Sequence, residues 1–200
     1  MRKRAEQVDE THQRIVEAAA GLHGTIGPAA TTIAGIAKEA GVTRLTVYRH
    51  FADEGAIFAA CSAHWLAQQV PPDPSAWARY VDPVERLQAG LTDLYRFYRE
   101  GVDMLTCIYR DMADLPPHRR AAIAQRDGHF AEVLLEPFRA SKARRRRLGA
   151  VVGHATAFGT WRSLCIEHGL SDRDATEAMT ALAVAVVGQH QRPTRAGRRG

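Results

Sequence analysis

The sequence has 200 residues, of which 46% are hydrophobic and 24% are charged, so its composition is that of a folded globular protein and excludes a disordered chain. The formal net charge is +5, but the basic excess is confined to residues 139–147, with six Lys or Arg and no acid, and residues 192–200, with four. No run approaches the roughly 20 apolar residues of a membrane helix and no apolar signal core follows the first residues, so we expect a soluble, cytoplasmic protein without membrane contact.

Apolar residues recur at spacings of three and four along the whole chain, whereas alternating β-branched or aromatic runs are almost absent. This pattern predicts an all-α fold with about nine helices. In chain order, we expect helices at about residues 11–24, 33–40, 44–51, 54–70, 83–100, 104–112, 118–139, 142–168 and 172–189.

The first four of these helices each follow a residue whose side-chain oxygen can cap free backbone N–H groups. The predicted caps are Thr11, Thr32, Thr43 and Asp53. Prolines after Val70 are expected to end the fourth helix.

Residues 32–51 predict two short helices joined by a turn that contains Gly41, which is the helix-turn-helix arrangement. Ala37 is small where the two helices approach, and an apolar set packs the pair onto the first helix: Ile36, Val42, Val47 and Phe51. The second helix of the pair then presents its remaining side chains outward: Arg44, Leu45, Thr46, Tyr48, Arg49 and His50.

This outward face has two guanidiniums, several hydroxyl or imidazole groups and no acid. Arginine can fork onto guanine, threonine can bond phosphate or touch a thymine methyl, and tyrosine and histidine can donate to phosphate oxygens. From these residues alone, binding to double-stranded DNA and an ordinary solvated polar helix are both open interpretations.

The run from Thr31 to Phe51, with Ala40-Gly41-Val42-Thr43 and Thr46-Val47-Tyr48-Arg49-His50 in order and spacing, resembles the DNA-binding domain of the TetR/AcrR family of bacterial transcriptional regulators. The resemblance covers about residues 12–60. It implies that Thr32, Thr43, Tyr48 and His50 hold phosphates and that Arg44, Leu45 and Thr46 face base edges in the major groove.

Three positions depart from the family pattern. Leu45 stands where a small residue is usual, Glu54 stands where a lysine would contact phosphate, and His23 stands where an aromatic core residue is expected. With no net charge over residues 1–54, these departures predict modest, salt-sensitive affinity for each DNA half-site, so that a dimer is needed.

The resemblance also implies a division into a helix-turn-helix DNA-binding domain at residues 1–55 and a helical ligand-binding and dimerisation domain at 56–190. Residues 191–200 are expected to form a basic disordered tail. The last two predicted helices carry stripes of small or apolar residues, which suit either packing within the chain or a four-helix homodimer interface. The stripes are Gly149, Gly153 and Ala157 in one helix, and Ala178, Leu182, Ala185 and Val186 in the other.

A small-molecule effector is likewise implied by the resemblance, and its identity cannot be read from the sequence. The candidate ligand-binding residues are bulky or soft side chains at helical spacing, which also suit a plain hydrophobic core: Tyr95, Tyr98, Met104, Cys107, Ile108, Phe130, Phe158 and Trp161.

We expect no metal, no cofactor and no enzymatic activity, because the histidines lack close-spaced partners, the three cysteines are far apart, and no catalytic motif is present. The resemblance implies a ligand-released transcriptional repressor that binds a palindromic operator as a homodimer. A DNA-binding structural factor without a ligand and, less favoured, an enzyme are the alternatives.

Overall fold

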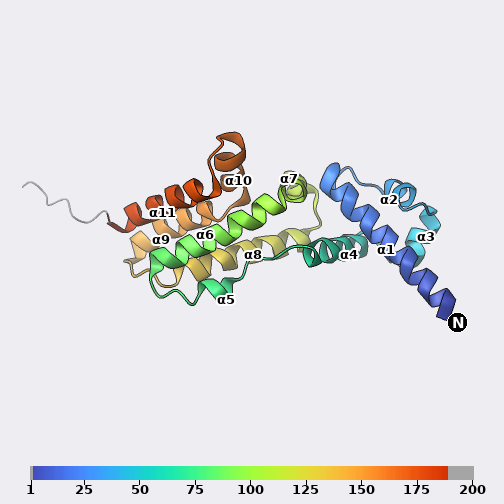
Figure 1. The fold of residues 1–200 in the computed structure, drawn as a ribbon, viewed down its shortest axis with the longest axis horizontal. Coiled ribbons are helices and arrows are strands. Elements are labelled where there is room, and N and C mark those ends of the chain that lie inside the picture. Colours follow the sequence, from blue (N-terminus) through green and yellow to red (C-terminus); the bar gives the residue numbers. More distant parts are fainter. Residues whose placement is uncertain (1, 189–200) are drawn as a thin grey trace, which may run out of the picture. The chain divides into compact units, whose positions relative to one another are not determined.

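The computed structural model describes residues 2–188, with side chains from residue 7, and within this range it contains helices and no strand (Figure 1). The predicted tail at 191–200 lies outside the described residues. The helices are α1 (Arg2–Thr25), α2 (Ile33–Glu39), α3 (Arg44–His50), α4 (Glu54–Ala67), α5 (Pro74–Trp77), α6 (Pro83–Glu100), α7 (Val102–Arg110), the 3-10 helix η1 (Met112–Asp114), α8 (Pro117–Leu135), α9 (Lys142–Ala155), α10 (Phe158–Trp161), the π-helix η2 (Arg162–Glu167) and α11 (Asp172–Gly188).

The chain divides into two compact units. Unit 1 consists of residues 1–71 together with 97–124, and unit 2 consists of 72–96 together with 125–200. The predicted boundary at residue 55 remains a prediction, and the boundaries between these units fall elsewhere, at residue 71 and within α6 and α8.

Unit 1 has a hydrophobic core that joins α1 to α2, α3 and α4. Val47 of α3 and Ile15 and Ala19 of α1 are fully buried in it. The other buried members are Val16, Ala18, Ile33, Ile36, Ala37, Ala40, Phe51, Ile57 and Cys61. Of the predicted apolar set of the helix pair, Ile36, Val47 and Phe51 are buried and Val42 is half-buried against this core, so the opposite faces of α2 and α3 are left to solvent.

The loop after α1 is tied to the end of α7 within the same unit. The backbone N–H of Ala29 donates to Oδ2 of Asp111 at 3.1 Å, and Nη2 of Arg110 donates to the carbonyl of Ile26 at 2.8 Å. Gly27 has φ +92°, a left-handed conformation that favours glycine, and a Cβ there would overlap the side chains of Arg110 and Asp111. The segment that leads into α2 is therefore held by α7.

Unit 2 is built around apolar residues of α6, α8, α9 and the last helices. Its largest fully buried side chains are Trp77, Leu87, Leu91, Leu94, Tyr95, Leu134, Leu148, Val152 and Trp161. The buried Arg86 is satisfied by the carbonyls of Ala78 and Tyr80 and by Glu136, whose carboxylate lies 2.8 Å from its guanidinium. Burial of this cation is tolerated because its guanidinium is hydrogen-bonded to these groups and to the carbonyl of Val133.

The two short helices of the predicted helix-turn-helix are confirmed, with Thr32 and Thr43 as caps, and Asp53 caps α4. Thr11 is not a cap. Helix α1 already begins at Arg2, because the residues before Thr11 are mostly good helix formers, and the Thr11 hydroxyl donates back to the carbonyl of Gln7 at 2.9 Å.

The count of nine helices is too low for the described residues. Asp73 caps a short helix, α5, with Pro74 in its first turn, where a missing N–H costs nothing. The helix expected at 142–168 breaks at Ala157, whose backbone is extended between α9 and α10, where the buried Phe158 and Trp161 pack. Of the helices in residues 2–188, none has the length and apolarity required to cross a membrane.

Candidate nucleic-acid interface

The turn between α2 and α3 is fixed by backbone hydrogen bonds and one left-handed residue. Gly41 has φ +64°, which a glycine adopts without strain, and the N–H of Val42 donates to the carbonyl of Ala37 at 2.9 Å. Oγ1 of Thr43 then accepts from the N–H of Thr46 at 3.1 Å and starts α3. These contacts set the direction in which α3 leaves the turn.

The exposed side of α3 carries most of the predicted DNA-binding residues. Leu45 is 60% exposed and Tyr48 is 55% exposed, while Val47 between them is fully buried. Arg44 and Arg49 are exposed, and neither guanidinium has a hydrogen-bond or ion-pair partner among the residues that the structure describes. Both cations are thus available to an outside partner.

Three threonines of the predicted site have roles within the fold. Oγ1 of Thr32 accepts from the N–H of Gly35 at 3.0 Å, and Thr43 and Thr46 place their hydroxyl oxygens 2.9 Å apart. Thr32 and Thr43 are exposed and Thr46 is half-buried. The capping oxygen of Thr32 accepts from the backbone, so its hydroxyl hydrogen stays available to a phosphate, whereas the bond between Thr43 and Thr46 uses one of their two hydroxyl hydrogens.

His50 is half-buried because its ring lies beside α1. The centroids of the His50 and His12 rings are 5.9 Å apart, and His12 stacks on Phe51 at 4.5 Å. This arrangement places an imidazole from α1 next to the end of α3. His12, which the sequence analysis did not single out, is a further candidate for phosphate contact at this end.

The charge around the helix pair is balanced. Residues 31–54 contain Lys38, Arg44 and Arg49 against Glu39, Asp53 and Glu54. Asp53 is engaged in capping α4, with Oδ1 2.7 Å from the N–H of Ala56, whereas Glu54 is exposed in the first turn of α4. The structure thus leaves a carboxylate where the family resemblance would place a phosphate-binding lysine.

His23 and Cys61 form a buried pair behind the helix pair, where the sequence did not predict one. His23 is 6% exposed, its Nδ1 lies 3.2 Å from Sγ of Cys61, and its ring lies 5.3 Å from that of Phe58. Burial lowers the pKa of His23 to about 4 and raises the pKa of Cys61 to about 11. Both groups are therefore neutral at physiological pH.

The eight candidate effector residues fall in both units. Tyr98, Met104, Cys107 and Ile108 belong to unit 1, and Tyr95, Phe130, Phe158 and Trp161 belong to unit 2. The polar ends of two of them are satisfied internally, since Tyr95 donates to the carbonyl of Ala155 and Trp161 donates to Asp172. Met104 lines an open cavity of about 390 Å³ in unit 1, next to Trp65 and Asp103.

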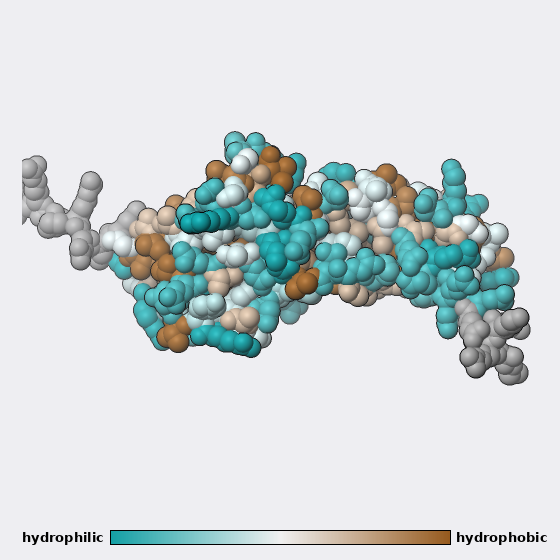
Figure 2. Space-filling model, viewed as in Figure 1, coloured by the Kyte–Doolittle hydropathy of each residue, from teal (hydrophilic) through white to brown (hydrophobic). Residues whose placement is uncertain are grey.

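The predicted dimer stripe of α11 lies on the surface of unit 2. Leu182 is 44% exposed, Ala178 and Ala185 are also exposed, and Val186 is half-buried. Gly149, Gly153 and Ala157 are half-buried. Figure 2 shows hydrophobic residues at the surface over α9 and α11. Within residues 2–188, no three His, Cys, Asp or Glu side chains gather as a metal site would require.

The segment that contains α2 and α3 is similar in sequence to known bacterial regulators. Residues 15–61 match the model of the bacterial regulatory proteins of the tetR family. Over 57 residues the chain is 40% identical to the HTH-type transcriptional regulator AcrR of Shigella flexneri. That stretch is 28% of this chain and 26% of AcrR, so the similarity spans about a quarter of that relative.

Two solved structures have a similar fold over most of the chain. A TetR-like transcriptional regulator from Rhodococcus sp. RHA1 aligns with a TM-score of 0.64 and 18% identity, over 90% of this chain and 96% of that one. The TetR family transcriptional regulator PfmR from Thermus thermophilus aligns with a TM-score of 0.56 and 21% identity, over 90% of this chain and 100% of that one. At these identities the likeness concerns the fold.

Proposed function

We propose that the chain is a transcriptional repressor of the TetR family, because residues 15–61 match the model of the bacterial regulatory proteins of that family and the fold is similar to that of two solved TetR-type regulators. It binds a palindromic operator as a homodimer in the cytoplasm and is released by a small-molecule effector. The observation that carries this proposal is the exposed face of α3, where Arg44, Tyr48 and Arg49 project from a helix fixed by capped ends and a buried Val47.

The operator is found by selecting random duplex DNA with the purified full chain at physiological salt, where nonspecific phosphate attraction is weak. We expect a palindrome whose half-sites are about one helical turn, roughly 34 Å, apart. If the protein is folded and no sequence is enriched, the proposal of sequence-specific binding is contradicted.

Two variants of α3 separate base contact from phosphate contact. Arg44→Ala should cost about 1 to 3 kcal/mol of operator binding and relax the base preference, whereas Tyr48→Phe should weaken all sequences alike. Arg79→Ala, which removes an exposed arginine in unit 2, is the matched control and should change neither. If Arg44→Ala kept the full operator preference, α3 would not read bases at that position.

The homodimer part of the proposal is supported by the exposed stripe on α11 and the small residues of α9. A two-fold interface formed by these two helices from each protomer would bury Leu182 and allow close approach at Gly149 and Gly153. Leu182→Glu should therefore raise the dimer dissociation constant at least tenfold in sedimentation equilibrium. Leu66→Glu, at a comparably exposed leucine of α4, should not. Equal effects of the two variants would count against this interface.

The effector part is supported by the open cavity of about 390 Å³ that Met104 lines in unit 1. A DNA-binding structural factor without a ligand remains the alternative function. Screening small apolar and aromatic compounds for release of the selected operator separates the two, because only a ligand-controlled repressor loses its operator in the presence of one compound.

A further inference from the structure

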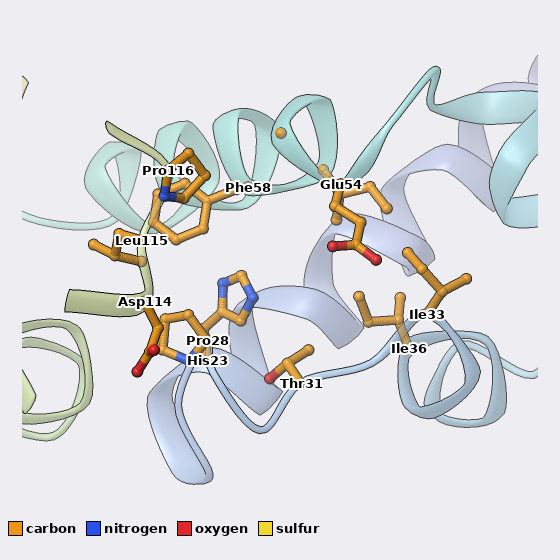
Figure 3. A pocket seen from close by; sticks show the side chains of 12 residues that line it. His23, Pro28, Thr31, Ile33, Ile36, Glu54, Phe58, Asp114, Leu115 and Pro116 are labelled. Carbon is orange, nitrogen blue, oxygen red and sulfur yellow. The ribbon is translucent and has the colours of Figure 1, made fainter. Parts of the chain in front are cut away.

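Unit 1 contains a cavity of about 160 Å³ beneath the first turns of α4, shown in Figure 3, which we call the α4 cavity. Its lining comes from α1, the loop before α2, α2 itself, α4 and residues 114–116. Its polar side chains include His23, Thr31, Glu54 and Asp114, and its apolar ones include Ile36, Phe58 and Leu115. None of them belongs to the predicted DNA-binding or effector set.

His23 offers the cavity a hydrogen-bond acceptor. The Cys61 thiol donates to the carbonyl of Phe58 at 3.3 Å, so the short contact between Sγ and Nδ1 of His23 is best satisfied when Nδ1 carries the hydrogen. The second ring nitrogen, Nε2, is then an acceptor, and no described residue donates to it. Figure 3 shows this imidazole, which is 94% buried, projecting among the lining side chains of the α4 cavity.

The remaining polar side chains of the lining also accept. The Thr31 hydroxyl donates to the carbonyl of Gly27 at 2.7 Å, which leaves its lone pairs for the cavity. Glu54 turns its carboxylate toward the cavity in Figure 3 and has no hydrogen bond or ion pair with another described side chain. Asp114, at the other side, adds a second carboxylate without such a partner. Both carboxylates are exposed, and one cation lies nearby: the Arg119 guanidinium is 5.6 Å from the Phe58 ring, with Nη2 3.5 Å from the carbonyl of Gly55. A ligand that satisfies the His23, Thr31 and Glu54 acceptors donates hydrogen bonds, and two carboxylates against one guanidinium favour a ligand with positive charge.

The rest of the lining is apolar and compact. Ile36, Phe58 and Leu115 provide aliphatic and aromatic surface. A cavity of about 150 Å³ lined by such residues is known to hold a single benzene ring, so the α4 cavity has the volume for a body of that size.

We propose that the α4 cavity binds a small ammonium compound with a compact apolar body, its N–H groups donating to Nε2 of His23 and to the carboxylate of Glu54. The apolar body lies against Phe58 and Leu115. Because His23 belongs to α1 and Glu54 to α4, the bound compound links the two helices directly. The site is separate from the effector site of the proposed repressor and does not depend on that function.

The test is a titration of the full chain with benzylamine, followed by NMR of isotope-labelled isoleucine methyl groups. We expect saturable shifts at Ile33, Ile36 and Ile57, which line the α4 cavity. Benzyl alcohol, which lacks the charge, and benzoate, which reverses it, should bind at least tenfold more weakly, in line with the strength of charged hydrogen bonds. Absence of shifts at these methyls, or equal binding of all three compounds, would overturn the proposal.

Two variants locate the contacts. Glu54→Gln, at an exposed position that should fold normally, should weaken benzylamine at least fivefold, while Glu39→Gln, an exposed carboxylate of α2 outside the lining, should leave it unchanged. His23→Phe should abolish binding. Equal affinity of the wild type and Glu54→Gln would overturn the assignment of an ammonium ligand. If the chain bound benzylamine but selected no operator, the ligand site of the α4 cavity would stand while the proposed repressor function would not.

Discussion

At the scale of single residues, His23 makes the stability of unit 1 depend on pH. The ring is neutral in the folded chain because burial lowers its pKa to about 4, whereas its ordinary value in an unfolded chain is about 6.5. Between these values the unfolded chain binds more protons. Stability is therefore full above pH 6.5, falls as the pH falls, and stops falling near pH 4.

We expect this single group to lower the free energy of unfolding by about 2 kcal/mol between pH 7.5 and pH 5. The measurement compares urea unfolding of the wild type and His23→Phe at both pH values. The variant should lose that part of the pH dependence, while His118→Gln, at an exposed histidine, should keep it. The same pH dependence in His23→Phe and the wild type would mean that His23 takes up a proton as readily in the folded chain as in the unfolded chain.

Substitution of Gly27 and Gly41 distinguishes two ways in which an added side chain destabilises the fold, backbone strain and steric overlap. Both have positive φ, but a Cβ at Gly41 meets no atom within 4 Å, whereas one at Gly27 overlaps Arg110 and Asp111. Gly41→Ala should cost about 1 to 2 kcal/mol of stability, from the backbone alone.

Gly27→Ala should cost about 1 to 3 kcal/mol more than Gly41→Ala, because the contacts of Asp111 with Ala29 and Arg110 must open. Denaturant unfolding of the two variants measures the difference. Equal losses would show that the loop moves aside without cost.

At the scale of helices, the charge at the start of α4 is the feature that distinguishes this helix-turn-helix unit from the family pattern. Glu54→Lys removes a repulsive carboxylate and supplies the lysine that the family pattern has there. We expect tighter operator binding and a plot of log affinity against log salt that is steeper by about 0.9, the value for one added phosphate contact. Glu10→Lys, an identical charge change on the exposed side of α1, should leave the slope nearly unchanged. A slope change of the same size in both variants would indicate a general charge effect.

The helix pair could be predicted closely from the sequence because its signals are local. Thr32, Gly41 and Thr43 mark its ends within one or two residues, and the apolar positions follow the helical period. The break at Ala157 could not be predicted, because Thr156 and Ala157 are compatible with a continuing helix and only the tertiary packing of buried Phe158 and Trp161 selects the turn. The pairing of His23 with Cys61 is equally a tertiary contact, across 38 residues.

At the scale of the whole molecule, the balanced charge of residues 31–54 leaves each half-site weak, so most of the operator affinity should come from linking two copies. A duplex with a single half-site should bind about a hundredfold more weakly than the palindrome. Fluorescence anisotropy with both duplexes at the same salt measures the ratio. Comparable affinities would mean that one protomer binds DNA unaided.

The candidate effector set shows the limit of sequence reasoning at this scale. Soft and aromatic residues at helical spacing identify buried helix faces, and six of the eight are buried, but burial does not distinguish a binding site from a core. The hydroxyl of Tyr95 donates to the carbonyl of Ala155 and the indole N–H of Trp161 donates to Asp172, so both polar groups are bonded within the fold. The effector prediction therefore stays a prediction.

The discontinuity of unit 1 bears on the construction of chimeric regulators. A graft of residues 1–71 alone would omit Arg110 and Asp111, which hold the loop after α1, and Leu115, which is buried in the same unit. The exchangeable part is therefore residues 1–71 and 97–124 together. Under the proposed function, a hybrid repressor that takes its operator choice from this chain and its ligand response from another protein would need two inserted segments.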